Sequence, residues 1–431
     1  MKFATLFLAT SSAAAATVPT IESLSADDHA SLVAELAQWK IDFGDIAKAQ
    51  GLLPPTANTR SLDDVVADEL QRLLNNKYAV EVARKNNPQA QFGTNHKFAL
   101  MSEAEFATYV KGSFKQANRS LRALPEAKLD VIDTAANNVD WTTGSCMPPV
   151  RDQGQCGSCW AFSATGVAEM GHCITTGQLF VLSEQQVTSC STDGGSQGCD
   201  GGWPWYAIDY VAKTGLCLDS DWPYTSGGSG QTGSCSTSCS KKKLSIGSSV
   251  RISGEDALAS ALTTQPVSVT VEAGNSVWQN YQGGVVTQCP GAQSDHAVIA
   301  VGYDGQSYKV RNSWGAGWGE AGYIRLQRGV GGVGTCNVVD GASYPQLSKP
   351  TPSTPTPSKS TPSPSHSTPA PSKSTPKPKT TTPKPTTPAP QPGCGSCQGC
   401  YYPDGDECLS DWTYDDCNYY SNSYGTIWCG N

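Results

Sequence analysis

The sequence contains no apolar run that could cross a membrane and no excess of positive charge. A spanning helix needs about 20 consecutive apolar residues, and no stretch of this chain reaches that length. The formal net charge is −8 at pH 7, which argues against nucleic acid or an anionic membrane surface as the main partner. We therefore predict no membrane span and no nucleic-acid partner, and we expect neither a metal nor a cofactor.

Histidine is also scarce, and cysteine is confined to part of the chain. Only five histidines occur in 431 residues, which narrows the search for a catalytic imidazole. Residues 17–130 hold no cysteine, although the whole chain has 17. If one thiol stays free, the other 16 divide into ten within 146–336 and six within 394–429. Each region can then close its own set of disulfides.

The N-terminus has the pattern of a secretory signal peptide. Lys2 is followed by a short apolar run and then by an alanine-rich stretch that ends at Ala16. A basic start, a short apolar segment and a small-residue cleavage site are typical of such signals. We predict removal of residues 1–16 and a secreted, extracellular product, with the lysosome or vacuole as the alternative destination. An oxidising compartment also favours disulfides.

One stretch has the features of a thiol nucleophile. Gly154 and Gly157 permit a tight turn, and apolar residues from Trp160 onward recur at roughly helical spacing. Cys159 therefore lies where a helix begins, and a helix N-terminus stabilises negative charge. That environment favours the thiolate, which is the reactive form of cysteine.

This stretch resembles the active-site segment of the papain and cathepsin cysteine proteases. The family carries Cys-Gly-Ser/Ala-Cys followed by Trp or Tyr, and residues 156–160 are Cys-Gly-Ser-Cys-Trp. The family's histidine and asparagine are matched by His296 and Asn312, which lie 137 and 153 residues after Cys159. The resemblance covers a peptidase domain at 135–347. It implies an α+β, two-lobed fold, with a helical lobe, an antiparallel β-barrel-like lobe and a substrate cleft between them.

The resemblance gives each matched residue a role. Cys159 is the nucleophile, His296 forms an ion pair with it and protonates the leaving amine, and Asn312 orients the imidazole. The Gln153 side chain and the Cys159 backbone N–H form the oxyanion hole. Trp314 either shields the bond between His296 and Asn312 from water or is an ordinary core tryptophan.

Two further residues, His172 and Asp295, could also take part in the chemistry. His172 is the other histidine of the protease region, and it lies about three and a half helical turns beyond Cys159, too far to touch the thiol. Elimination therefore supports His296. Asp295, the neighbour of His296, either tunes the ion pair or is a solvated loop acid.

The family's substrate-binding positions are matched as well. Gly201 and Gly202 form a wall that a substrate backbone can approach closely. The residues at the family's S2 pocket carry no charge, and they are Trp203, Pro204, Thr270, Ser294, Ala297 and Gly341. We expect polypeptide substrates with a bulky hydrophobic P2 residue (Leu, Phe, Val). No histidine lies between residues 173 and 295, so the occluding loop of cathepsin B is not matched and we predict an endopeptidase.

The resemblance also implies disulfides within the protease region. Two of them follow from the family pattern, and a third is similar to an extra bridge in cathepsin B. These three pairs are Cys156–Cys199, Cys289–Cys336 and, for the extra bridge, Cys146–Cys173. The remaining residues Cys190 and Cys217 share Cys235 and Cys239 in an order that the sequence leaves open.

Residues 17–134 are predicted to be an inhibitory propeptide. Two amphipathic segments, Ser31–Trp39 and Asp63–Lys85, are helix candidates. They precede Phe92–Phe106, which resembles a block of the papain-family propeptide. The resemblance implies a zymogen that its own propeptide inhibits and that is cleaved near residues 130–136.

The match to the family's propeptide is partial. Leu100 stands at the family's Asp position, which removes the carboxylate through which a pH trigger would act. Asn75 is the only clear survivor of the family's helical signature. Asn118–Ser120 fits an N-glycosylation acceptor.

The predicted secondary structure of the peptidase region changes from helices and loops to strands along the chain. It is helix-prone and then loop-rich to about residue 240, whereas strand-like segments such as Gln265–Val271 and Tyr323–Leu326 follow. Helices first and a twisted antiparallel sheet second give an α+β protein.

The C-terminal part of the chain is a linker and a small module. Residues 348–392 are rich in Pro, Thr and Ser, which predicts an extended spacer of roughly 140 Å at about 3.1 Å per residue. Residues 393–431 hold six cysteines and eight Tyr or Trp, more rings than so small a disulfide-stapled core can bury. Exposed rings suit stacking on sugars, so we predict polysaccharide binding. The alternative is a structural or protein-binding module.

The sequence as a whole favours a monomeric, secreted cysteine endopeptidase that is made as a zymogen. One rival is a non-catalytic homologue that kept the fold. Another is a wall-binding adhesin with a vestigial protease. The presence of Gln153, Cys159, His296 and Asn312 argues against both.

Overall fold

The computed structural model describes most of the chain up to residue 347 and a few residues near the C-terminus. The described residues are 18–55, 62–111, 138–236, 238–347, 397, 399–402, 407–409 and 427–429. The predicted signal peptide, propeptide cleavage region, glycosylation acceptor and linker lie outside them. The chain divides into two units, Met1–Thr354 and Pro355–Asn431, and each is described by itself.

Three helices and a short strand precede the peptidase region. They are α1 (Ala26–Ala49), α2 (Leu62–Asn86), β1 (Ala90–Phe92) and α3 (Glu103–Lys111). Ser25 caps α1 by accepting the backbone N–H of Asp28. Ser102 and Glu105 form a reciprocal capping box at the start of α3, with bonds of 2.9 and 3.3 Å. Both predicted helices are present, and α1 extends beyond its predicted segment at both ends.

A helical lobe follows, built around one buried helix. Its helices are α4 (Cys159–Thr176), α5 (Glu184–Cys190) and α6 (Pro204–Thr214). Every residue of α4 from Cys159 to Cys173 is buried, because α6 and the sheet pack on it. The helix ends at Gly177, whose φ of 77° is the left-handed conformation that glycine tolerates at a C-terminus.

The second lobe is a sheet of mostly antiparallel strands. Its strands are β2 (Val139–Asp140), β3 (Ile246–Ile252), β4 (Val267–Val271), β5 (Tyr281–Val286), β6 (His296–Tyr303), β7 (Ser307–Arg311), β8 (Tyr323–Gln327) and β9 (Ala342–Leu347). Among the described residues, the order is β1-β5-β8-β7-β6-β4-β9-β3, and β2 pairs with β6. Only β5 and β8 run parallel in this order. The predicted α+β class, with helices first and strands second, is confirmed.

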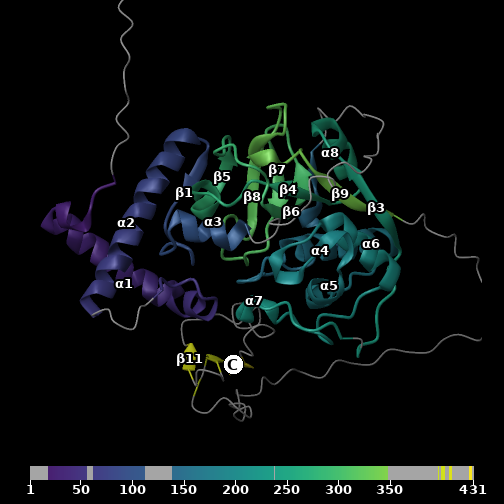
Figure 1. Ribbon diagram of the computed structural model, residues 1–431, viewed down its shortest axis with the longest axis horizontal. Coiled ribbons are helices and arrows are strands. Elements are labelled where there is room, and N and C mark those ends of the chain that lie inside the picture. Colours follow the sequence, from purple (N-terminus) through teal and green to yellow (C-terminus); the bar gives the residue numbers. More distant parts are fainter. Residues whose placement is uncertain are drawn as a thin grey trace, which may run out of the picture. The chain divides into compact units, whose positions relative to one another are not determined.

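Short helices fill the connections between these elements. They are α7 (Ser226–Ser229), α8 (Glu255–Leu262), α9 (Ser276–Gln279), η1 (Ile21–Ser23), η4 (Trp141–Thr143), η5 (Asp193–Gly195), η6 (Gly198–Asp200) and η7 (Thr335–Asn337). Figure 1 shows α2 beside β1 at one edge of the sheet, with α1 against α2, and α4 and α6 near β9 and β3 at the other edge, with α5 below α4. None of the helices in the described part of the chain is long and apolar enough to cross a membrane.

The N-terminal elements and the sheet form one folded unit. Strand β1 pairs antiparallel with β5, so that Ala90 lies opposite Gly284. Gly284 has a φ of 79°, and a Cβ there would lie 2.3 Å from the backbone oxygen of Gln89. Only glycine permits this approach. The first nine strands of the chain therefore belong to one sheet.

The C-terminal unit contains a small sheet. Its strands β10 (Cys400–Tyr402), β11 (Glu407–Leu409) and β12 (Ile427–Trp428) are arranged in the order β11-β10-β12. Cys397 forms a disulfide with Cys408. A sheet this small needs such a covalent link because it buries little apolar surface.

Five disulfides lie within the peptidase region. They are Cys146–Cys173, Cys156–Cys199, Cys190–Cys235, Cys217–Cys239 and Cys289–Cys336. The pairing that the sequence left open is therefore Cys190 with Cys235 and Cys217 with Cys239. Among the described residues, Cys159 is a cysteine that forms no disulfide.

Candidate active site

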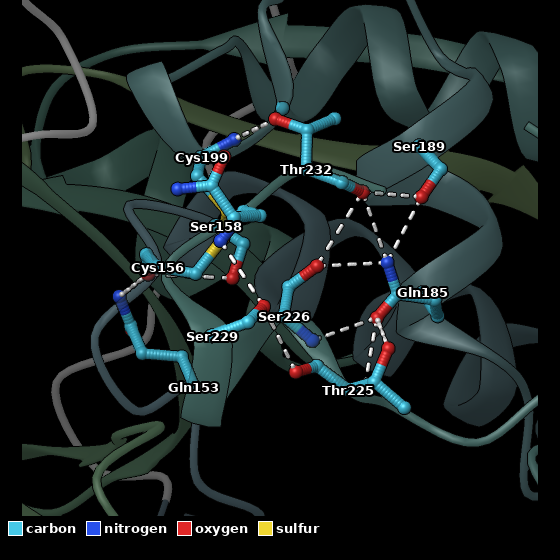
Figure 2. Close-up of a disulfide and its surroundings, with 12 residues drawn as sticks. Gln153, Cys156, Ser158, Gln185, Ser189, Cys199, Thr225, Ser226, Ser229 and Thr232 are labelled. Carbon is cyan, nitrogen blue, oxygen red and sulfur yellow. Dashed lines mark hydrogen bonds between the residues drawn. A yellow bond between two sulfur atoms is a disulfide. The ribbon is translucent and has the colours of Figure 1, made fainter. Parts of the chain in front are cut away.

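The turn before α4 holds Cys159 at the start of the helix. Gly154 has a φ of 56°, which permits the tight turn. The backbone N–H of Gly157 donates to Cys199 at 3.0 Å, and the disulfide between Cys156 and Cys199 fastens the same turn (Figure 2). Cys159 is completely buried and not bonded to another cysteine. Its backbone lies where the N–H groups of a helix have no intrahelical acceptor.

The thiol of Cys159 lies against the first residues of β6. The backbone N–H of Ala297 donates to its Sγ at 3.2 Å, and His296 is the preceding residue. The imidazole Nε2 of His296 is 2.8 Å from Oδ1 of Asn312, which directly follows β7. That Oδ1 also accepts the backbone N–H of Ser313 at 2.8 Å, so the Nε2 of His296 is the donor. Its Nδ1 has no hydrogen-bond partner among the described residues.

Burial determines the charge of His296 in this closed state. Burial lowers the pKa of His296 to about 4, and the hydrogen bond to Asn312 opposes this shift only in part. The imidazole is therefore neutral at neutral pH while the site is covered. An imidazolium opposite a thiolate requires that water reach the site.

Trp314 covers the imidazole from one side. Its ring stacks on His296 at a centroid distance of 4.9 Å and an interplanar angle of 22°. It also meets Trp278 and Trp318 edge to face at 6.1 and 5.0 Å. The ring of Trp314 is therefore buried in the core and also stacked on His296.

The side chain of Gln153 is held at both ends. Its Nε2 donates to the backbone oxygen of Cys156 at 3.0 Å (Figure 2). Its Oε1 accepts the hydroxyl of Ser313 at 2.6 Å. The backbone oxygen of Cys156 determines which end of the amide is the donor, because a carbonyl oxygen can only accept. No sequence motif pointed to Ser313, although it directly follows Asn312.

The residues predicted for the S2 pocket lie on both lobes. On the sheet lobe, Thr270 pairs with Ala297 across β4 and β6, and its backbone N–H donates to Gly341 at 2.9 Å. A Cβ at Gly341 would lie 3.0 Å from the Thr270 hydroxyl, so this corner is closely packed. Ser294 is buried just before β6, and its hydroxyl has no hydrogen-bond partner in the part of the chain that the structure describes.

On the helical lobe, Trp203 and Pro204 begin α6. The Trp203 ring stacks on Trp205 at a centroid distance of 4.4 Å. A Cβ at Gly202 would lie 2.6 Å from the ring of Trp160, so this backbone rests directly on the tryptophan. Gly201 has a φ of 107°, which a larger residue rarely adopts.

Asp295 is not a solvated loop acid, so that alternative is wrong. Its side chain is buried and accepts the backbone N–H groups of Ala273 and Gly274 at 2.8 and 3.2 Å. These bonds close the turn that follows β4. His172 accepts the backbone N–H of Ser245 at 2.9 Å and stacks on Phe180 at 4.9 Å, which is a structural role.

Comparison with known proteins identifies the family. The model described as "Papain family cysteine protease" matches residues 135–346. Digestive cysteine proteinase 2 of Homarus americanus is 36% identical over 301 residues, which cover 66% of this chain and 91% of that protein. The chain belongs to the papain family of cysteine proteases. Oryzain beta chain of Oryza sativa subsp. japonica is 38% identical over 61% of this chain, and the match spans 57% of that protein.

Solved structures of precursors share the papain-like fold. Digestive procathepsin L 3 of the Tenebrio molitor larval midgut has a TM-score of 0.60 and 30% identity, covering 73% of this chain and 99% of that chain. The proform of the ragweed pollen allergen Amb a 11 has a TM-score of 0.61 and 28% identity, covering 77% and 97%. The predicted two-lobed fold is confirmed. The matching family is described as one of cysteine proteases, and the Homarus americanus relative is named a cysteine proteinase, so the enzyme class is that of a papain-type cysteine endopeptidase.

Aromatic side chains from the segment before the protease domain cover Trp314. Phe98 and Phe106 meet the Trp314 ring edge to face at 5.6 and 5.5 Å, and Tyr109 lies 6.4 Å from it. All three follow β1 or belong to α3. In this papain-family chain, the residues preceding the protease domain are therefore packed onto the ring that stacks on His296.

Polar contacts fasten the same segment to the protease domain. His96 Nε2 lies 3.1 Å from Asn280 Oδ1, and its Nδ1 accepts the backbone N–H of Phe98 at 3.1 Å. Burial lowers the pKa of His96 to about 4, although the hydrogen bond to Asn280 acts to raise it. Lys97 is buried and forms an ion pair with Asp152, the neighbour of Gln153. The neutral imidazole of His96 and the ion pair of Lys97 with Asp152 therefore join the preceding segment to the protease domain.

The asparagine that supports this segment is Asn76, the neighbour of the Asn75 that the sequence matched to the family's helical signature. Asn75 is exposed, whereas Asn76 is buried and donates to the backbone oxygens of Ala99 and Met101 at 2.7 and 2.9 Å. Leu100, at the family's Asp position, is completely buried in the apolar core. The loop that carries Phe98 is thus held by α2.

Proposed function

We propose that this protein hydrolyses peptide bonds with Cys159 as the nucleophile and His296 as its proton-transfer partner. The observation that carries the proposal is the contact of 3.2 Å between the Cys159 Sγ and the backbone of Ala297, next to His296. The hydrogen bond of 2.8 Å between His296 and Asn312 adds the third member. Cys159 lies more than 130 positions before both His296 and Asn312 in the sequence, and it forms no disulfide.

We assign the proton transfer to one nitrogen of His296, Nδ1. Nε2 is committed to Asn312, so Nδ1 is the atom that exchanges protons with the thiol. In the opened enzyme, the Cys159 thiolate attacks the scissile carbonyl carbon, and the oxygen gains negative charge. The amide of Gln153 and the backbone N–H of Cys159 stabilise that charge.

Breakdown of this intermediate needs the same imidazole. The imidazolium of His296 donates its Nδ1 proton to the leaving amine, the C–N bond breaks and a thioester to Cys159 remains. The neutral Nδ1 then takes a proton from water, whose oxygen attacks the thioester carbonyl. The acid product leaves, and the thiol is regenerated. Asn312 keeps the ring in orientation throughout.

The direct test is hydrolysis of a fluorogenic peptide with Leu or Phe at P2. The processed parent enzyme, the same enzyme after alkylation and the variant Cys159→Ala are compared. The parent should be active, and the other two should lose nearly all activity. Hydrolysis by Cys159→Ala at the parent rate would contradict the proposal, because the nucleophile would then lie elsewhere.

We also propose a preference for bulky hydrophobic P2 residues. The support is the uncharged character of the six residues at the S2 positions and the close packing of Gly341 on Thr270. A cationic P2 side chain would find no carboxylate among these residues. A peptide-library scan should favour Leu, Phe and Val, and selection of basic P2 residues would refute this.

We propose that residues 17–134 keep the enzyme inactive until cleavage near residues 130–136. The cover of Phe98, Phe106 and Tyr109 over Trp314 supports this, as do the precursor structures that the chain resembles. Adding the isolated segment to processed enzyme should inhibit it. Unchanged activity at micromolar concentrations of the segment would count against inhibition.

We propose that the mature enzyme is secreted, monomeric and directed to polysaccharide by residues 393–431. The partly exposed rings of Tyr401 and Trp428 on the small sheet support the targeting, because such rings stack on sugar faces. Pull-down of the C-terminal module on cellulose, glucan and chitin should retain it on at least one. Failure on all three would favour the protein-binding alternative.

A further inference from the structure

One phenol connects the two segments from which the oxyanion hole is built. The hydroxyl of Tyr224 donates to the backbone oxygen of Gln153 at 2.9 Å. The hydroxyl oxygen of Tyr224 also lies 2.7 Å from the hydroxyl of Ser158, the residue before Cys159. A phenol has a single hydrogen and the Gln153 carbonyl can only accept, so Ser158 donates to Tyr224. The bonds therefore run from Ser158 through Tyr224 to Gln153.

We propose that Tyr224 is a positioning residue that sets the oxyanion hole. The inference rests on the proposed function, since it deepens the role of the same site. One donor of the hole is the side chain of Gln153, and the other is the backbone N–H of Cys159. Tyr224 hydrogen-bonds to the backbone oxygen of Gln153 and to the side chain of Ser158, the residue before Cys159. It thereby fixes the separation of the two donors without contributing a donor itself.

Contacts with α4 and α5 hold Tyr224 and the residues that follow it in place. Its ring packs edge to face on Phe162 of α4 at 4.8 Å. The backbone N–H groups of Thr225 and Ser226 donate to the side-chain oxygen of Gln185 at 2.8 and 3.0 Å, as Figure 2 shows. Gln185 belongs to α5, so a regular helix fixes the segment that directly follows Tyr224.

The segment after Tyr224 also touches the turn that carries Gln153. The backbone N–H of Gln155 donates to Gly227 at 2.9 Å. A Cβ at Gly154 would lie 2.4 Å from the backbone oxygen of Gly227, so the two backbones meet closely. Burial raises the pKa of Tyr224, and the phenol therefore remains a donor at any pH at which the enzyme works.

The test compares Tyr224→Phe with the parent in the processed full-length product. The ring and its packing on Phe162 remain, and only the hydroxyl is removed. We expect kcat for the fluorogenic peptide to fall about tenfold with KM changed less than about twofold, because the oxyanion exists only in the transition state. Affinity for a peptide aldehyde, whose adduct carries the same oxygen, should fall by about the same factor.

A second readout separates positioning from general damage. Alkylation of Cys159 by iodoacetamide uses the thiolate without an oxyanion, so its rate should stay at the parent value in Tyr224→Phe. The control is Tyr210→Phe, which removes another hydroxyl of the helical lobe, the acceptor of Gln186 Nε2 at 3.1 Å. It should leave kcat unchanged.

Ser158→Ala provides a second variant if Tyr224→Phe folds poorly. It removes the other end of the chain of bonds, and we expect a smaller loss of kcat, about threefold, with alkylation again unchanged. Parent-like kcat in both variants overturns the inference, as does a loss of alkylation as large as the loss of kcat. If the parent itself hydrolyses no peptide, the proposed function fails and the inference fails with it.

Discussion

The thiol side and the imidazole side of the catalytic centre are stabilised by different parts of the chain. On the thiol side, the Cys156–Cys199 disulfide and the bonds to Gln153 and Tyr224 all lie within the protease domain. On the imidazole side, Trp314 is packed by Phe98 and Phe106 from the preceding segment. Removing that segment should therefore mainly change the surroundings of His296, whereas on the thiol side it removes the ion pair between Lys97 and Asp152.

The largest expected effect is on the imidazole side. His296→Ala removes the group that protonates the leaving amine, so kcat of the processed enzyme should fall about 10³-fold or more. Steady-state kinetics on the fluorogenic peptide measure this. The variant His172→Ala, whose imidazole is distant from the thiol, is the control and should keep parent kcat. A similar loss in both variants would contradict the assignment.

The next effect tests the thiol side. Gln153→Ala removes one oxyanion donor and should lower kcat about 10²–10³-fold, with little change in KM. The alkylation rate of Cys159 should stay near the parent value, because the ion pair does not depend on this amide. Equal losses in both assays would show that Gln153 supports the fold of the turn and not the transition state.

Phe98→Ala together with Phe106→Ala should separate the two sides. The change removes the rings that pack on Trp314, and truncation of a buried Phe typically costs about 3–5 kcal/mol. The latent activity of the uncleaved chain should rise about 10²-fold, whereas kcat after processing should equal that of the parent. The exposed pair Val33→Ala and Ile41→Ala in α1 is the control. Unchanged latency in the Phe variants would argue that the cover is dispensable.

The smallest effect concerns pH and His96. Its pKa is lowered to about 4 from an ordinary value of 6.5, so the docked state binds fewer protons than the released state. Docking is fully stabilised above pH 6.5 and is lost as the pH falls from 6.5 through about 4. Between pH 7 and pH 5, the docking constant should fall about twentyfold. Lys97, the residue after His96, forms an ion pair with Asp152.

Release is measured as the pH at which the uncleaved chain becomes open to iodoacetamide. His96→Gln keeps a donor and an acceptor but cannot be protonated, so its midpoint should move to lower pH. His172→Gln, in the helical lobe, should leave the midpoint unchanged. A His96→Gln profile that superimposes on the parent would exclude this histidine as the sensor.

The features that could be predicted from the sequence are those that depend on neighbouring residues in the chain. The start of α4 at Cys159 follows from the turn glycines and the apolar spacing, and β4 and β8 follow from their β-branched residues. The matched positions of His296 and Asn312 came from resemblance. Their contact, however, depends on β6 and β7 being neighbours in the sheet, which no local pattern shows.

Other features could not be read from the chain because they arise from tertiary packing. Tyr224 and Gln153 are 71 positions apart, and His96 and Asn280 are 184 apart, so neither pair leaves a local signal. The burial of Asp295 depends on the turn after β4, which its own neighbours do not specify. The choice of Asn76 over Asn75 depends on which face of α2 turns toward the Phe98 loop.

The claim that residues 17–134 cover the catalytic centre is tested most directly by the alkylation rate of Cys159 at pH 7, measured before and after their removal. We expect slow alkylation in the uncleaved chain, where Cys159 is completely buried, and a rate at least about 10²-fold higher in the processed enzyme. Mass spectrometry should locate the label on Cys159. Equal rates in the two forms, or a label on another residue, would contradict the account.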